Sequence, residues 1–438
     1  MVSTIEIIIK ICSYIGIAYG VLKAYQFLYY IGVFKRKKFK ATSNFHSYGI
    51  CIAARNEAKV IYNLLESISR QDYPKDKIKI FVVADNCNDD TASIVMSFIK
   101  EMKEKDTYNR IDTYLYAHNN SEEKTKGFAL KYLFEKIKEE HYLECEAYLV
   151  FDADNILSPS YLSKINEAYD AGNDVVVSLR NSKNPMQNWI SFSYAIHWLR
   201  TCLNHRGVSL LNMPCRIQGT GFLFDKKYVE QGWIYTSLTE DRAFSSDIIL
   251  KGGNIAHCED AVFYDEQPYK LGVALKQRLR WSKGHLQSAI ENCPKLIKNI
   301  FSFNKKTLPS YEMFWINFPT SIESLFRNLI SWLCQIIIGI IVSNVYGVIY
   351  GILTSILIGY GLIWLKGMFE SLFVFIYYHK YLPRVSFFKL SFYIFMFPFF
   401  DLIGKYTSYI ALFKKVEWNP CPHDYHVELD SFHANLNK

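Results

Sequence analysis

Two carboxylates stand two positions apart after an apolar run, in the order Phe151-Asp152-Ala153-Asp154. In an extended segment, residues i and i+2 point the same way, so Asp152 and Asp154 can reach one site. Hard cations such as Mg2+ or Mn2+ bind carboxylate and phosphate oxygens, and Mg2+ often uses only one or two protein carboxylates. The pair therefore predicts a metal site beside a phosphate-bearing ligand, and an acidic turn without function is the alternative.

A second group of chemically useful residues lies on a helix expected within residues 264–283. Gln277, Arg280 and Trp281 stand at i, i+3 and i+4, so an amide, a guanidinium and an indole share one face. Arg forms forked bonds to phosphate oxygens, and Trp offers a flat apolar face with one polar group. The trio suits a phosphate next to a sugar ring. The alternative is an amphipathic helix with a core Trp and solvated arginines.

The triplet Thr239-Glu240-Asp241 opens a helix expected to run to Leu250. Thr239 is a good N-cap, and acidic residues in a first turn interact favourably with the helix dipole, so one reading is structural. The other reading makes Asp241 a general base that removes a proton from an attacking hydroxyl. Upstream, residues 218–221 (Gln-Gly-Thr-Gly) supply a flexible polar turn.

The elements that must position these residues alternate between strand and helix. Apolar runs predict strands at residues 49–54, 78–84, 111–117, 147–151 and 174–179, and helical periodicity predicts helices at 57–69, 90–102, 126–138 and 159–170. This alternation is typical of an α/β fold of Rossmann-like type, with right-handed crossovers and a mixed, mainly parallel sheet. Ligands of such sheets bind at the carboxyl ends of the strands.

Polar residues follow the first two predicted strands. Arg55 and Glu57 come after the first, and Asp85 comes after the second. Asp85 is placed to accept hydrogen bonds from a base or ribose edge. Asn88 or Asp89 could equally cap the following helix, because Asx residues favour caps and turns.

The cytosolic domain expected at residues 35–309 is flanked by membrane segments. Residues 1–34 carry an apolar run long enough to span a bilayer, and Lys35, Arg36, Lys37, Lys38 and Lys40 follow it. The positive-inside rule then places the middle of the chain in the cytoplasm. The net charge of +8 lies largely in such clusters, which favours membrane lipids as partners, and no motif predicts nucleic-acid binding.

A second membrane region is expected at residues 328–413, with three or four spans at 330–349, 350–378 and 385–413. Two pairs of opposite charge, Lys366 with Glu370 and Asp401 with Lys405, lie one helical turn apart, so each pair can neutralise itself or face a polar interior. Residues 310–327 predict an interfacial helix, and 414–438 predict a short tail too small for a regulatory domain.

In their order and spacing, these motifs resemble the membrane-embedded inverting glycosyltransferases of family 2, which include cellulose, hyaluronan, chitin and poly-N-acetylglucosamine synthases. The resemblance runs from about Gly49 to His285 and implies a GT-A fold, a UDP-sugar donor and Mg2+ or Mn2+. The donor-binding residues it implies are Ala53, Arg55, Glu57, Asp85, Lys126, Asp152, Gln277 and Arg280. The acceptor-binding residues it implies are Gly219, Thr220, Gly221, Glu240 and Trp281, with Asp154 on the metal and Asp241 as the base. One departure is Ala84-Asp85, where the family commonly has two acids.

The resemblance implies a multi-pass enzyme of the plasma membrane whose cytoplasmic domain extends a polysaccharide and couples synthesis to export, with accessory export subunits as conceivable partners. One alternative is a non-processive enzyme that glycosylates a lipid or lipid-linked acceptor. A more distant alternative is a transporter or scaffold with a nucleotide-binding domain, but neither an inverted repeat nor a Walker-type glycine loop is found in the sequence.

Overall fold

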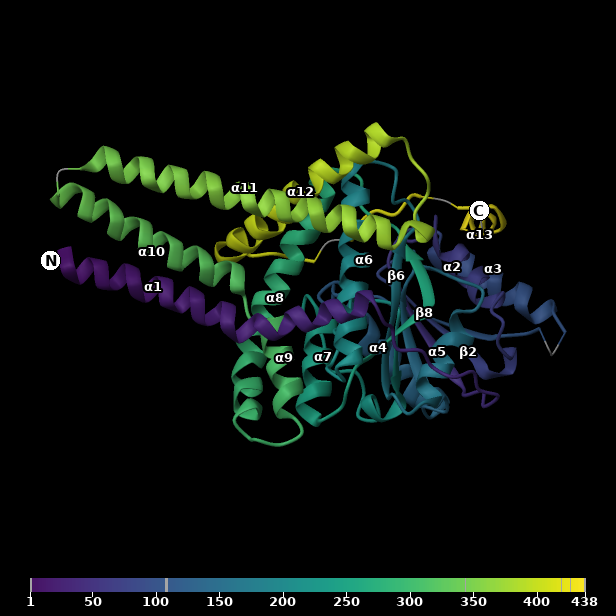
Figure 1. The fold of residues 1–438 in the computed structure, drawn as a ribbon. Coiled ribbons are helices and arrows are strands. Elements are labelled where there is room, and N and C mark those ends of the chain that lie inside the picture. Colours follow the sequence, from purple (N-terminus) through teal and green to yellow (C-terminus); the bar gives the residue numbers. More distant parts are fainter. Residues whose placement is uncertain (1, 107–108, 343, 419, 426, 437–438) are drawn as a thin grey trace.

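A mixed β-sheet forms the centre of the computed structural model, which describes residues 2–106, 109–342, 344–418, 420–425 and 427–436 (Figure 1). Within these residues the sheet has eight strands in the order β3-β2-β1-β4-β7-β6-β8-β5. The strands are β1 (Tyr48–Ala54), β2 (Ile78–Asp85), β3 (Asp112–His118), β4 (Ala147–Asp152), β5 (Ile156–Leu157), β6 (Val175–Ser182), β7 (Phe222–Asp225) and β8 (Ala256–Asp265). The predicted strands correspond to β1, β2, β3, β4 and β6, and the α/β fold class is confirmed.

The strand directions bring the predicted site residues to one edge. β3, β2, β1 and β4 are parallel, and the register pairs Ala54 with Ala84 and Ala53 with Asp152. β7 runs antiparallel to both β4 and β6, while β6 is parallel to β8. The carboxyl ends of β1, β2 and β4 therefore lie together, as expected for a ligand site in a parallel sheet.

Helices cover both faces of this sheet because its strands alternate between two buried clusters. Ile50 and Ile52 of β1 pack with Leu64 in one cluster, whereas Cys51 packs with Leu130 in the other. The covering helices include α2 (Ile61–Ser69), α3 (Thr91–Glu104), α4 (Lys126–His141), α5 (Tyr161–Asp170) and α7 (Glu240–Lys251). Short elements complete the domain: η2 (Lys75–Lys77), η3 (Lys226–Tyr228), η4 (His379–Tyr381) and α13 (Leu429–Leu436).

Two long helices connect the sheet domain to the apolar helices. α6 (Trp189–Leu210) begins with a capping box at Asn188, and α8 (Leu271–Ile300) carries the predicted Gln-Arg-Trp face. A third buried cluster joins Leu199 of α6 to Phe397 and Phe400 of the C-terminal helix α12 (Phe387–Phe413). The sheet domain and α12 therefore share a hydrophobic core.

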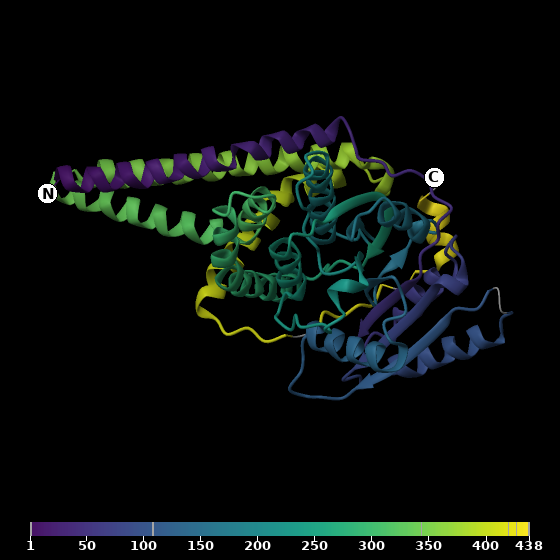
Figure 2. The same cartoon turned by 90° about the horizontal axis from the view of Figure 1, so that it is seen from below.

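Four helices among the described residues are long and apolar enough to cross a membrane: Ser3–Val33, Thr320–Ile341, Tyr346–Tyr377 and Phe387–Phe413. The first comprises α1 (Val2–Lys23) and η1 (Ala24–Val33), and the others are α10 (Thr320–Ile341), α11 (Val345–Tyr377) and α12. Figures 1 and 2 show α1, α10 and the first part of α11 projecting together from the sheet domain.

Several boundaries in the C-terminal region differ from the sequence prediction. The prediction of one helix over residues 310–327 is wrong. Two helices share this range: α9 (Thr307–Asn317) ends at Asn317, and α10 begins after Pro319. Proline lacks an N–H and pushes the preceding residue out of the helical region, so Phe318 is extended. The predicted boundary between residues 349 and 350 is also wrong, because Asn344 caps α11 by accepting the N–H of Gly347.

The intrahelical charge pairs have two different outcomes. Lys366 Nζ and Glu370 Oε1 lie 3.5 Å apart, so this pair neutralises itself. Asp401 pairs instead with Arg200 of α6, at 2.8 Å, and Arg200 also reaches Glu370 at 3.1 Å. Of the two alternatives for Asp401, the structure shows the polar interior and not a pair with Lys405. A guanidinium from a distant helix neutralises Asp401 and ties α6, α11 and α12 together.

Candidate active site

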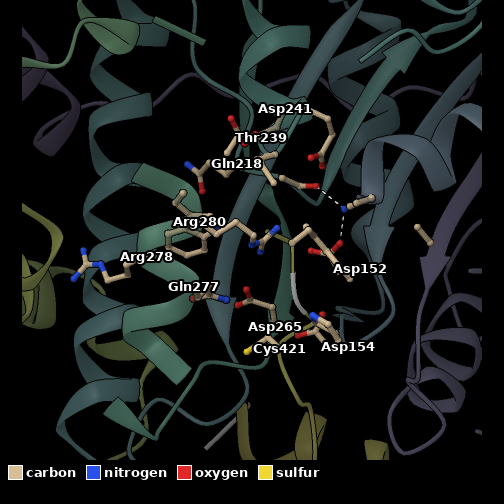
Figure 3. Close-up of a pocket in the computed structure, with 18 of the residues that line it drawn as sticks. Asp152, Asp154, Gln218, Thr239, Asp241, Asp265, Gln277, Arg278, Arg280 and Cys421 are labelled. Carbon is tan, nitrogen blue, oxygen red and sulfur yellow. Dashed lines mark hydrogen bonds and ion pairs between the residues drawn. The ribbon is translucent and has the colours of Figure 1, made fainter. Parts of the chain in front are cut away.

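One cavity of about 340 Å³ gathers most of the predicted site residues (Figure 3). It lies at the carboxyl ends of the central strands and extends along α8 to α12. The predicted residues that line it are Ala53, Arg55, Glu57, Asp85, Lys126, Asp152, Asp154, Gly219, Glu240, Asp241, Gln277, Arg280 and Trp281. Segments more than 200 residues apart in the sequence therefore converge on one space.

Lys126 connects two walls of this cavity. Its ammonium forms an ion pair with Asp152 and donates a hydrogen bond to the backbone carbonyl of Gly219 at 2.8 Å. The next residue, Gly127, must be glycine, because a Cβ there would lie 2.3 Å from the carbonyl oxygen of Tyr235. This close packing at the start of α4 places Lys126 between the two segments.

Thr220 and Gly221 do not line the cavity, so the acceptor contact predicted for them is not seen. Thr220 Oγ1 accepts the N–H of Asp152 at 2.9 Å and donates to Asn155 Oδ1 at 2.5 Å. Gly221 has a φ of +64°, and a Cβ there would lie 2.1 Å from the ring of Phe263. Both residues support the turn that carries Asp152 and Asp154.

Asp154 is buried and hydrogen-bonded at the same turn. It accepts the N–H of Glu266 at 2.8 Å and a side-chain N–H of Asn155 at 3.1 Å. Burial acts to raise the pKa of Asp154, but nearby His423 and Lys183 outweigh it and hold the pKa below its ordinary value. The carboxylate is therefore ionised at neutral pH, as a metal ligand must be.

The residues around Asp154 fit a divalent cation that a phosphate ligand helps to hold. Within the described ranges, no group of three or more His, Cys, Asp or Glu side chains could hold a metal ion by itself. Glu57 and Asp154 raise the pKa of His423 well above its ordinary value despite its burial, so the protonated imidazole competes with a metal ion for these carboxylates. One protein carboxylate plus phosphate oxygens is a common arrangement for Mg2+.

Glu240 and Asp241 lie at the start of α7, at the opposite wall from Asp154. Burial raises the pKa of Asp241, and Arg242 next to it counters this only in part. Burial likewise raises the pKa of Glu240 to about 7. A half-buried carboxylate with a raised pKa is a stronger base than a free one, so Asp241 has the properties of a proton acceptor.

Thr239 occupies the N-cap position of α7, but the side-chain capping bond of the structural reading is not formed. Its side chain forms no capping bond, and Oγ1 is buried without a partner. A Cβ on Gly284 of α8 would lie 2.4 Å from Thr239 Cγ2, so this side chain is packed tightly against α8. Asp90, and not Asp89, occupies the N-cap position of α3, but Asp89 accepts the N–H of Thr91 in its first turn at 3.1 Å.

The helical face predicted on α8 does face the cavity. Gln277, Arg280 and Trp281 all line it, and Trp281 packs edge-on to the ring of Trp198 at 5.7 Å. Figure 3 shows Arg280 pointing toward Asp152, whereas Arg278 points away. Arg278 donates to the carbonyl of Phe400 and lies 3.8 Å over its ring, which anchors α8 to α12.

At the donor end, Asp85 already has partners within the chain. Its carboxylate pairs with Arg55, and His118 Nδ1 lies 2.8 Å away. Arg55 Nε also donates to the carbonyl of Asp85 at 3.0 Å. The ends of β1 and β2 are thereby locked together, and contact of Asp85 with a base or ribose stays a prediction.

The C-terminal tail enters the cavity, which the sequence pattern did not predict. Trp418 stacks on two arginines, with its ring 4.7 Å from the guanidinium of Arg55 and 5.8 Å from that of Arg280. His423 Nδ1 lies 3.0 Å from both carboxylate oxygens of Glu57. Figure 2 shows the segment after α12 running along the molecule to α13. The tail therefore forms part of the cavity wall.

A buried ion pair in the cavity wall was also missed. Arg180 of β6 pairs with Asp265 of β8, donates to the carbonyl of Gln218 at 2.7 Å and stacks 3.7 Å over the ring of Trp198. All of these partners are distant in sequence, so no local pattern indicates the pair. It links the Gln218 turn to the strand that ends beside Asp154.

Comparison with known proteins gives the family. The family described as "Glycosyltransferase like family 2" matches residues 46–284, more than half of the chain. A probable glycosyltransferase YdaM of Bacillus subtilis is 24% identical over 61% of this chain and 61% of its own length. A poly-beta-1,6-N-acetyl-D-glucosamine synthase of Staphylococcus aureus is 27% identical over 59% of this chain and 58% of its own. The matches thus span about three fifths of these relatives.

A solved structure shares the fold. The mannosyltransferase PcManGT from Pyrobaculum calidifontis, in complex with GDP-Man and Mn2+, superimposes with a TM-score of 0.55 and 15% identity. The superposition covers 86% of this chain and 98% of the other. At this identity, the likeness establishes the arrangement of strands and helices alone.

Proposed function

The chain belongs to glycosyltransferase family 2, and we propose that it transfers a hexosyl group from a UDP-sugar to a growing polysaccharide, with inversion at the anomeric carbon. The observation that carries this proposal is the convergence of Asp154, Asp241 and Arg280 on one cavity. A cation ligand, a base and a diphosphate-binding guanidinium are the groups that such a transfer requires.

The reaction is a single in-line displacement. The acceptor hydroxyl oxygen forms a bond to the anomeric carbon while the bond from that carbon to the diphosphate oxygen breaks. Asp241 takes the hydroxyl proton, and UDP leaves with the bonding electron pair. Arg280, which points toward Asp152, stabilises the charge that develops on the diphosphate.

Asp154 would hold a Mg2+ or Mn2+ ion together with oxygens of the donor diphosphate. When bound, the metal neutralises charge on the leaving group. Lys126 and Arg55 lie in the same cavity, where they neutralise Asp152 and Asp85. Because the ion pair with Lys126 neutralises Asp152, the carboxylates of Asp152 and Asp154 do not both repel the diphosphate.

The cavity reaches a candidate membrane span, which supports movement of the product toward the membrane. Gly404 and Thr407 of α12 line the cavity, so an apolar helix forms part of its wall. Trp281, which lines the same cavity, offers a ring face on which a sugar can stack. We therefore assign a processive synthase of the plasma membrane, with its catalytic domain in the cytoplasm and export coupled to elongation.

Product length separates this proposal from transfer to a lipid acceptor. The purified protein, with Mn2+ or Mg2+, is offered UDP-glucose, UDP-N-acetylglucosamine and other UDP-sugars labelled in the sugar, with GDP-mannose in parallel. Release of UDP and a ladder of labelled polymer are expected. A single labelled sugar on extracted lipid would replace the processive assignment by the lipid-acceptor alternative. Turnover of GDP-mannose without turnover of any UDP-sugar would contradict the assignment of a UDP-sugar as the donor.

A further inference from the structure

A basic groove of about 570 Å³ lies outside the active site, where two candidate membrane spans end. Its walls include Lys35, Arg36, Lys38, Arg206, Tyr377 and Lys380. The first span ends at Val33 and the third at Tyr377, and the hydroxyl of Tyr377 donates to the carbonyl of Val33 at 3.2 Å. The two spans therefore meet at the groove.

Close backbone packing fixes the floor of the groove. A Cβ on Gly32 would lie 2.6 Å from the amide nitrogen of Gly207, and a Cβ on Gly207 would lie 2.0 Å from the carbonyl oxygen of Tyr29. The end of the first span and α6 thus cross in backbone contact. Arg206, next to Gly207, is held directly under the groove.

The positive charge of the groove is only partly compensated. Arg36 pairs with Asp260 at 2.8 Å, and Arg206 pairs with Glu259 at 3.1 Å. For Lys35, Lys38 and Lys380, no carboxylate partner exists in the part of the chain that the structure describes. An excess of three ammonium groups surrounds the cavity, so an anionic occupant is favoured.

Arg206 supplies a built donor at the base of the groove. It is 8% exposed, and its Nε is buried without a hydrogen-bond partner. Its guanidinium lies 5.1 Å from the ring centre of Tyr377. The guanidinium has further N–H donors besides the one bonded to Glu259, and phosphate oxygens are suitable acceptors for them.

We infer that this groove binds the phosphate of an anionic phospholipid headgroup. Basic residues at the ends of spans attract anionic lipids, and tyrosines are enriched at the same depth. Phe34, which is 87% exposed at the mouth of the groove, and Ile376, which is 59% exposed, offer apolar surface for acyl chains, which a free phosphate would not use. The inference requires residues 3–33 and 346–377 to cross the bilayer and is independent of the donor sugar.

The test compares lipids and matched variants. Full-length protein in phosphatidylcholine nanodiscs receives spin-labelled phosphatidylglycerol or phosphatidylcholine, and the immobilised fraction gives the relative association constant. The variant Lys35→Gln, Lys38→Gln, Lys380→Gln removes the unpaired charges. The control Lys103→Gln, Lys298→Gln, Lys305→Gln removes three exposed lysines elsewhere.

Wild-type protein and control are expected to prefer phosphatidylglycerol, and the groove variant is expected to lose about tenfold or more of that preference. Equal association of both lipids with the wild type would overturn the inference, as would an equal loss in the control. Full displacement of the lipid by millimolar inorganic phosphate would make the groove a site for a soluble anion instead. Failure to enter nanodiscs would refute the spans on which the inference rests. UDP release measured in detergent reports separately on the active site.

Discussion

The ammonium of Lys126 forms an ion pair with Asp152 and so joins the first turn of α4 to the end of β4. The same ammonium holds the carbonyl of Gly219 at 2.8 Å. One side chain therefore fixes the distance between two walls of the candidate donor site. Charged groups that are already in place before the substrate binds lower the activation barrier of the transfer, because they need not reorganise during the reaction.

Replacing Lys126 by alanine tests this link. Hydrogen bonds to charged groups contribute about 1.5–3 kcal/mol, so Lys126→Ala is expected to lower kcat/KM for the donor by about ten- to a hundredfold. Lys131→Ala, on the same helix but exposed, is the control and should leave the rate unchanged. Initial-rate kinetics of UDP release measure both. Equal rates for Lys126→Ala and the wild type would show that the link has no role in transfer.

Asp154→Asn addresses the metal. Because Asp154 would be the main protein ligand, its loss should raise the Mn2+ concentration for half-maximal activity by about tenfold or more. Asp174→Asn, at an exposed ion pair with Lys227, is the matched control. Activity and Mn2+ binding by electron paramagnetic resonance are measured across a metal titration. An unchanged titration curve for Asp154→Asn would remove this residue from the metal site.

Trp418→Ala addresses the tail. Trp418 stacks on Arg55 and Arg280, and cation–π contacts contribute about 0.5–2 kcal/mol. Its loss should free Arg280 and open the cavity to water, which lowers kcat/KM by about three- to tenfold. Trp418→Phe keeps a ring face and should retain most of the activity. Faster turnover by Trp418→Ala would instead mean that the tail obstructs the donor.

The pH dependence follows from the burial of Asp241. A base must be deprotonated, so kcat/KM should rise with pH through the pKa of Asp241, which burial places above the ordinary value of 3.8. Arg242 lowers that pKa, so Arg242→Met should move the acid limb to higher pH. Arg70→Met, at an exposed ion pair, is the control. A shift toward lower pH in Arg242→Met would contradict the assignment.

The strands that are continuous apolar runs in the sequence could be predicted from the sequence alone. β1, β2 and β4 are continuous apolar runs because both faces of the sheet are covered. β8 was missed because Glu259 and Asp260 interrupt it. Their charges are neutralised by Arg206 and Arg36, which lie far away in sequence.

The same limit applies to the site. Asp152, Asp154 and the α8 face follow from spacing within one element, and the structure brings them to one cavity. Trp418 lies 363 residues after Arg55, and Asp401 lies 201 residues after its partner Arg200, so these contacts leave no periodic trace. Thr239 packs tightly against Gly284 and forms no capping bond, although its residue type favours one.

Asp241→Asn tests most directly whether Asp241 removes the acceptor proton during sugar transfer. Asp247→Asn, on the same helix but outside the cavity, controls for folding. UDP release and UDP affinity are measured on the purified wild type and on both variants. Asp241→Asn is expected to lose about 100- to 10,000-fold in rate while its Kd for UDP stays within about twofold of the wild type. Turnover by Asp241→Asn close to the wild-type rate would contradict this role of Asp241.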